Sequence, residues 1–228
     1  VILALLMSSR RIVSAIEWVK GLEGTDAEIT KQCEKGKSQF AGPEIKGKKL
    51  GVIGLGAIGV LVSNAAVELG MKVYGYDPYV SVDNAWNLSQ AVNHSNSLKE
   101  IYENCDYITI HVPATPDTKG MINSESIAMM KNGVRIINLA RGELVNTADV
   151  AQALDANKIG CYVADFANND LLGKENVILL PHLGASTPES EDNCASMAAE
   201  ELMDFLENGN IKNSVNMPAA HMDRTGDT

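Results

Sequence analysis

Apolar residues near the start of the chain recur at the spacing of an amphipathic helix. The pattern runs from Val1 to Lys20 and predicts one continuous helix over that range. Its apolar positions include Leu5, Ile12, Ile16 and Val19. The stretch from Gly21 to Pro43 is polar and punctuated by glycine, so we expect a connector with about one helical turn there.

The sequence pattern changes at Lys48, where short apolar runs, typical of strands, begin to alternate with segments suited to helices. Strands are predicted at Lys48–Ile53, Met71–Tyr76, Tyr107–Val112, Val134–Leu139, Ile159–Phe166 and Val177–Leu180. Helices are predicted at Ala57–Leu69, Ser97–Asn104, Ser124–Met130 and Thr147–Asn157. Because the strands are apolar at consecutive positions, helices should cover both of their faces. The predicted fold class is α/β, a doubly wound parallel sheet with a further helix on its N-terminal side.

The end of the chain carries a strong helix-start signal. Ser186-Thr187-Pro188-Glu189 resembles a capping box and predicts a long helix that reaches about Glu207. Asn208-Gly209-Asn210 should end that helix, because glycine and asparagine accept the backbone conformation that follows a helix.

The segment Gly54-Leu55-Gly56-Ala57-Ile58-Gly59 is a GxGxxG pattern between a predicted strand and a predicted helix. Alone the pattern is weak, but this strand–turn–helix context is the one that binds a dinucleotide. Gly54 permits a tight turn, Gly56 lets the backbone approach a pyrophosphate, and Gly59 lets helix and strand pack closely. Residues 46–212 are therefore expected to form a Rossmann-type dinucleotide-binding domain.

Two neighbouring features would complete the cofactor site. Ala57 and Ile58 open the helix, whose free N–H donors and partial positive charge suit phosphates. Asp77, followed by Pro78, stands at the end of the second strand, where a carboxylate can bind an adenosine ribose. The carboxylate would also repel a 2′-phosphate, which favours NAD over NADP. A plain turn after the strand is the alternative interpretation of Asp77-Pro78.

Two later loops place candidate catalytic side chains just past strand ends, where open parallel sheets bind ligands. Arg141 follows Asn138-Leu139-Ala140 and could hold a carboxylate through two hydrogen bonds, or be an ordinary surface arginine. His182 lies in Pro181-His182-Leu183-Gly184. Histidine exchanges protons near neutral pH, which suits general acid–base catalysis, although a lone histidine is more often structural.

Five ordered segments together resemble the D-isomer-specific 2-hydroxyacid dehydrogenases. They are VIGLGAIG, YGYDPY, CDYITIHVPATPDTKGMIN, INLARGELVN and PHLGAST, and the resemblance runs from Val1 to about Pro218. It implies hydride transfer between NAD and C2 of a small D-2-hydroxy acid, with Arg141 binding the carboxylate and His182 exchanging the proton. It also implies a cofactor cleft lined by His111, Val112, Pro113, Thr118, Ala140, Arg141, His182 and Gly184, with Asp165 facing the nicotinamide.

One departure from the family concerns the partner of the catalytic histidine. Members carry a glutamate there, whereas this chain reads Asp165-Phe166-Ala167-Asn168-Asn169-Asp170. Asn169 could accept a hydrogen bond without adding charge, and Asp170 lies one residue beyond the position at which the family carries its glutamate. Without a neighbouring carboxylate the His182 imidazolium should be less stabilised, which would shift the pH optimum for reduction toward acid.

A second departure concerns how much of the family's length is present. By resemblance, residues 1–45 hold the interdomain helix and connector of a substrate domain, and residues 213–228 lead toward a regulatory domain. Both domains are expected to be missing, so the chain should bind NAD but turn over substrate poorly. Overall likeness favours 3-phosphoglycerate and 3-phosphohydroxypyruvate as the substrate pair. A hydroxypyruvate or glyoxylate reductase and a non-catalytic NAD(H) sensor are the alternatives.

Composition narrows the expected partners. With 19 basic and 29 acidic residues the net charge is −10, which disfavours nucleic acid and anionic membranes. The four cysteines form no CxxC pair and no metal-ligand spacing occurs, so free thiols and no metal are expected in a cytoplasmic protein. The apolar start is too short to span a bilayer. A two-fold homo-oligomer is the expected assembly.

Overall fold

The computed structural model describes residues 1–222 and divides the chain into two compact units, residues 1–182 and residues 183–228. The domain boundaries predicted from the sequence, after residues 45 and 212, stay predictions. The first 45 residues fall in the first unit because their leading helix packs against the sheet. Residues 223–228 of the predicted tail lie outside the described residues.

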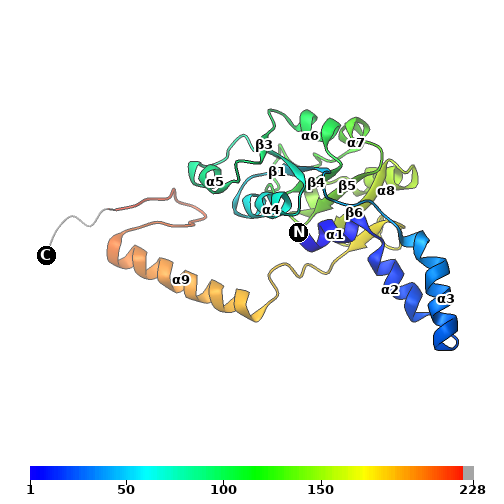
Figure 1. The fold of residues 1–228 in the computed structure, drawn as a ribbon. Helices are drawn as coiled ribbons and strands as arrows, with labels where there is room; N and C mark the ends of the chain where they lie inside the picture. The colour runs from blue at the N-terminus through cyan, green and yellow to red at the C-terminus, as the bar shows by residue number, and fades with distance from the viewer. Residues whose placement is uncertain (223–228) are drawn as a thin grey trace. The chain divides into compact units, whose positions relative to one another are not determined.

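A seven-stranded sheet forms the centre of the first unit (Figure 1). Its strands are β1 (Lys49–Ile53), β2 (Lys72–Tyr76), β3 (Asn93–His94), β4 (Tyr107–Ile110), β5 (Val134–Asn138), β6 (Ile159–Ala164) and β7 (Val177–Leu179). All pairs are parallel, in the order β3-β2-β1-β4-β5-β6-β7. From β1 the strands are added in sequence toward one edge as far as β3, and from β4 toward the opposite edge, so the strand order reverses between β1 and β4, as in Rossmann folds. The six predicted strands are confirmed with small differences at their ends, and β3 was not predicted.

Helices cover both faces of this sheet and create a separate apolar core on each (Figure 1). The helices of one core are α1 (Ile2–Ser9) and α4 (Ala57–Glu68), and those of the other are α6 (Leu98–Asn104), α7 (Ser124–Met129) and α8 (Thr147–Asp155). Side chains of consecutive strand residues point to opposite faces and pack in different cores: Ile136 lies in one core and Ile137 in the other. This two-sided burial explains the unbroken apolar runs and confirms the doubly wound prediction.

The predicted single helix over Val1–Lys20 is wrong, because the chain leaves the helical conformation at Arg10. α1 ends there and α2 (Ile12–Lys20) starts after it, with Arg10 extended at φ −134° and ψ 144°. The Nε of Arg135 on β5 donates to the Ser8 carbonyl at 2.8 Å, which is the acceptor that a continuous helix would offer to Ile12. Ile12 N instead donates to Arg10 O at 2.7 Å. A side chain of β5 therefore occupies the acceptor that a continuous helix would use at this point.

The connector is more helical than predicted. It contains α3 (Asp26–Gly36), a helix of 11 residues, followed by the 3-10 turn η1 (Lys37–Phe40). A capping box starts α3, with the Thr25 amide donating to Glu28 Oε2 at 2.8 Å. The prediction of about one helical turn between residues 21 and 43 was therefore wrong. Outside the connector, a short helix, α5 (Val82–Asn87), capped by Ser81, was also not predicted.

The second unit is built around the long helix α9 (Pro188–Asn208). Thr187 caps its start by accepting from Ser190 N, and Gly209 ends it at φ 74°. The start and end agree with the sequence prediction. Within residues 1–222, none of the helices combines the length and apolar character needed to cross a membrane.

Candidate functional site

Neighbouring strands end together at the carboxyl edge of the sheet, and the residues that follow them form the candidate site. The register aligns Ile53 of β1 with Ile110 of β4, Ile110 with Asn138 of β5, and Asn138 with Ala164 of β6. The segments beginning at Gly54, His111, Leu139 and Asp165 therefore leave the sheet side by side. The amide of Leu180 donates to Ala164 O at 2.9 Å, so the loop that carries His182 starts at the same edge.

The three glycines of the turn between β1 and α4 differ in what a larger side chain would contact at each position. Gly54 has φ 93°, and a Cβ there would lie 2.8 Å from the carbonyl carbon of His111. A Cβ on Gly59 would lie 1.9 Å from Gly54 O, so the helix can pack against the turn only with glycine. A Cβ on Gly56 would meet no described atom within 4 Å. Gly56 is therefore not needed for packing, which leaves its surroundings open to a ligand.

The surroundings of the turn fit a dinucleotide. Gly56 is the N-cap of α4 and has no side chain to cap it, which leaves the first-turn amides at Ala57 and Ile58 available to phosphate. Asp77 Oδ2 accepts from Leu55 N and Oδ1 accepts from Tyr79 N, both at 2.8 Å. Each carboxylate oxygen keeps an acceptor position that a ribose hydroxyl could use. Asp77 thus both forms the turn with Tyr79 and holds the glycine loop through Leu55. Pro78 is exposed.

The loop after β4 is held by hydrogen bonds of its own. Thr118 Oγ1 donates to Pro113 O at 2.6 Å and accepts from Thr115 N at 2.8 Å, so Thr118 fixes the loop that carries Val112 and Pro113. At the start of this loop, His111 Nε2 lies 3.0 Å from Thr109 Oγ1. Burial lowers the pKa of His111 to about 4. His111 is therefore neutral near pH 7 and adds no positive charge beside the glycine turn.

The lowered pKa of His111 predicts a loss of stability in acid. As the pH falls through 6.5 the unfolded chain protonates His111, whereas the folded chain does so only near pH 4. The free energy of unfolding should therefore drop over this window, by at most about 3 kcal/mol. Urea unfolding from neutral pH to about pH 5 should show a shallower decline for His111→Gln than for the parent chain. His94→Gln, at an exposed position, is the control; equal slopes for all three proteins would contradict the assignment.

His182 meets a carboxylate at the end of β6. Its Nδ1 lies 3.2 Å from Asp165 Oδ2, and the Phe166 ring lies 5.3 Å from the imidazole. His182 has φ 56°, in the left-handed region that residues other than glycine adopt uncommonly. The Asp165 side chain is 7% exposed and that of His182 is 63% exposed, so the carboxylate is buried while the imidazole is open to solvent.

The prediction that His182 lacks a carboxylate neighbour is therefore wrong. Asp165 occupies that position, because the pairing of β6 with β7 brings the two strand ends together. Asn169 is exposed, and Asp170 accepts a hydrogen bond from Thr147 Oγ1 at 2.8 Å instead. The expected acid shift of the pH optimum loses its basis with this finding. That Asp165 faces a nicotinamide stays a prediction.

Arg141 is exposed on the loop after β5, at the start of the 3-10 turn η2 (Gly142–Leu144). Its Nη1 donates to Ala140 O at 2.7 Å. The fully buried Asn138 shapes this loop, since its Nδ2 donates to Arg141 O at 2.8 Å and its Oδ1 accepts from Ala140 N at 3.2 Å. Sequence reasoning assigned Asn138 no role, although an amide at the end of an apolar strand was a visible signal. Gly184 lies in the second unit, so its proposed cofactor contact stays a prediction.

The fold and this edge define a Rossmann-type domain that offers a phosphate-binding turn, a guanidinium and an imidazole–carboxylate pair. The chain belongs to the family of D-isomer specific 2-hydroxyacid dehydrogenases, whose NAD binding domain matches residues 3–184. This confirms the family resemblance and the expected cofactor, NAD.

Several known proteins are similar to this chain in sequence or in structure. The chain is 36% identical over 199 residues to D-3-phosphoglycerate dehydrogenase of Bacillus subtilis, covering 85% of this chain and 37% of that protein. The human enzyme of the same name is 36% identical over 191 residues, covering 80% and 35%. D-lactate dehydrogenase of Aquifex aeolicus, solved with NAD and lactic acid, superposes with a TM-score of 0.70 at 26% identity, covering 90% and 64%. The chain thus spans little more than a third of these curated relatives.

Proposed function

We propose that this chain supplies the NAD-binding part, and with it the carboxylate-binding and proton-exchanging side chains, of a dehydrogenase for a D-2-hydroxy acid. The observation that carries the proposal is the His182–Asp165 pair, 3.2 Å apart, at the same sheet edge as the glycine turn. Bound NAD would supply or accept the hydride. The residues of this chain would bind the substrate, orient it and move the proton.

Each side chain has a role that follows from its chemistry. Arg141 exchanges its hydrogen bond to Ala140 O for the carboxylate of the substrate, which its planar guanidinium can hold bidentately. Asn138 positions Arg141 through the loop backbone. His182 donates a proton to the oxygen on C2 during reduction and removes it during oxidation. Asp165 stabilises the protonated imidazole and fixes its orientation, as a carboxylate does in other imidazole pairs.

The proposed substrate pair is 3-phosphoglycerate and 3-phosphohydroxypyruvate, the first step of serine biosynthesis. Its support is the name shared by the curated relatives, among them the proteins from Bacillus subtilis and human. Rates with 3-phosphohydroxypyruvate and with hydroxypyruvate would distinguish this enzyme from a hydroxypyruvate or glyoxylate reductase. Binding of NADH without turnover of either compound, in a hybrid that restores the missing substrate domain, would favour the NAD(H) sensor.

The first test is a fluorescence titration of the chain with NADH and, in parallel, with NADPH. We expect saturable binding with a preference for NADH. Asp77→Asn should weaken NADH binding by about tenfold, since a charged acceptor is lost, and should narrow the preference over NADPH. Asp83→Asn, an exposed carboxylate on α5, is the matched control and should bind as the parent does. Equal affinity for both nucleotides in the parent chain would contradict the role of Asp77.

A further inference from the structure

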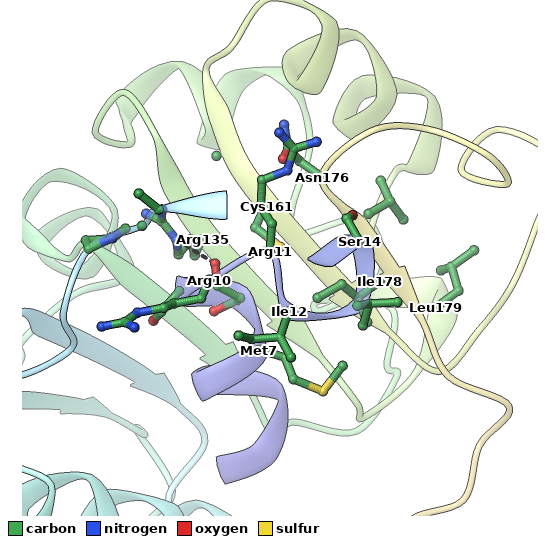
Figure 2. A pocket seen from close by; sticks show the side chains of 18 of the residues that line it. Met7, Arg10, Arg11, Ile12, Ser14, Arg135, Cys161, Asn176, Ile178 and Leu179 are labelled. Atoms are coloured by element: carbon green, nitrogen blue, oxygen red, sulfur yellow. Dashed lines mark hydrogen bonds between the residues drawn. The ribbon is translucent and has the colours of Figure 1, made fainter. Parts of the chain in front are cut away.

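A cavity of about 600 Å³ lies in the first unit, beside the edge strand β7 and at the break between α1 and α2 (Figure 2). Its volume falls within the range of small-molecule binding sites. Leu180, whose amide bonds to Ala164 O, is among its lining residues, but none of the residues proposed to bind NAD or the substrate lines it. It is therefore a second concave feature of this domain, separate from the proposed NAD and substrate residues.

The walls of this cavity combine an apolar side with a polar rim. Figure 2 shows Met7, Ile12, Ile178 and Leu179 along one side of it, and Arg11 and Asn176 toward the other. The apolar side chains come from α1, α2 and β7. A ligand that fits must therefore bury an apolar body and keep a polar group at the rim.

The charge of the lining is opposite to that of the whole protein. Among the described residues that line the cavity there are three arginines, Arg10, Arg11 and Arg135, and no aspartate or glutamate, although the chain carries a net charge of −10. Arg135 is held in place by Ser8 O and Gly133 O, at 2.8 and 3.2 Å, and lies over the Tyr107 ring. A fixed guanidinium in a cavity wall favours an anionic ligand group.

Arg11 is the arginine most able to bind such a group. Its one described ionic partner is Glu175, at 2.6 Å, and both side chains are well exposed, at 41% and 70%. A pair of that exposure contributes little stability, so a ligand anion can replace Glu175 at small cost. Arg11 is also the N-cap of α2 and makes no side-chain capping bond, so first-turn amides of that helix add to the positive potential.

We propose that the cavity binds a small organic anion, an apolar body with a single carboxylate or sulfonate group. The apolar body would pack against Ile12 and Ile178, and the acidic group would pair with Arg11 and face Arg135. The site lies away from the dinucleotide turn, so it would be occupied together with NAD. It does not depend on the proposed dehydrogenase activity.

The test uses 8-anilinonaphthalene-1-sulfonate, an apolar anion whose fluorescence rises on binding, titrated with saturating NAD⁺ present. N-phenyl-1-naphthylamine has a similar apolar body without the charge and serves as the ligand control. We expect one sulfonate probe per chain, and about tenfold weaker binding for Arg11→Gln. Arg11→Lys keeps the charge and should retain most of the affinity. Lys20→Gln makes the same change of charge on α2, away from the cavity, and should bind as the parent does.

Three results would overturn the proposal. The first is equal affinity of the parent and Arg11→Gln for the sulfonate, and the second is an equal loss in Lys20→Gln, which would indicate a general charge effect. The third is loss of probe binding as the protein concentration rises, which would show that a second copy of the chain covers the cavity. Far-ultraviolet circular dichroism of each variant establishes that it is folded.

Discussion

Replacing Gly59 by alanine should destabilise the first unit severely, whereas replacing Gly56 should leave it folded but unable to hold NADH tightly. The added Cβ at residue 59 would lie 1.9 Å from Gly54 O, a backbone atom that cannot move aside alone. Either α4 or the turn must shift, at a cost of about 3 kcal/mol or more. At residue 56 the same Cβ meets no described atom within 4 Å.

The two variants separate packing from ligand binding. Gly56→Ala should keep the thermal midpoint of the parent and lose at least about tenfold in NADH affinity, because its methyl group enters the space through which a pyrophosphate approaches. Thermal unfolding followed by circular dichroism, with NADH titrations of the folded variants, gives both quantities. If Gly56→Ala unfolds like Gly59→Ala, or binds NADH like the parent, the assignment of Gly56 to the ligand is wrong.

The glycine turn could be predicted because its information is local. Strand, turn and helix lie within one short stretch, and the constraint on Gly59 comes from Gly54 O, five residues earlier. The close approach of His111 to Gly54 is the one constraint of this turn that comes from a distant part of the chain. The apolar strands were predictable for a similar reason, since burial on both faces leaves a continuous apolar run that needs no partner to be visible.

The helix break at Arg10 is accompanied by a contact from a distant part of the chain. Arg135 on β5 donates to Ser8 O, and no pattern of residues near Arg10 indicates that contact. The helix α3 is a different case. Its capping residues Thr25 and Glu28 stand in the sequence at the spacing of a capping box, so the signal was available and the polarity of the stretch outweighed it.

The partner of His182 shows the same limit at the functional site. A search along the chain for a glutamate at a fixed offset found Asn169 and Asp170, which the structure places elsewhere. Asp165 was visible at the end of a strand, but only the parallel pairing of β6 with β7 shows that the two strand ends meet. Register between strands is not encoded by the spacing of residues within one of them.

Asp165→Asn should lower turnover far more than Asp170→Asn, and His182→Gln should lower it most. His182→Gln removes the proton-exchanging group, with an expected loss on the order of a thousandfold in kcat/KM. Asp165→Asn keeps the shape but removes the charge beside Nδ1, with an expected loss of about tenfold to a hundredfold. The measurement is NADH oxidation with 3-phosphohydroxypyruvate, in a hybrid where this chain replaces the matched region of the Bacillus subtilis relative.

Asp170→Asn is the matched control, because it makes the same chemical change five positions further along the loop, where the carboxylate pairs with Thr147. Its turnover should stay within about twofold of the parent, as for other changes at exposed positions. The reverse order, with Asp170→Asn impaired and Asp165→Asn active, would mean that the loop rearranges on substrate binding and that Asp170 serves His182. Equal and full activity of both variants would show that His182 needs no carboxylate, and Asp165 would then be a buried structural residue.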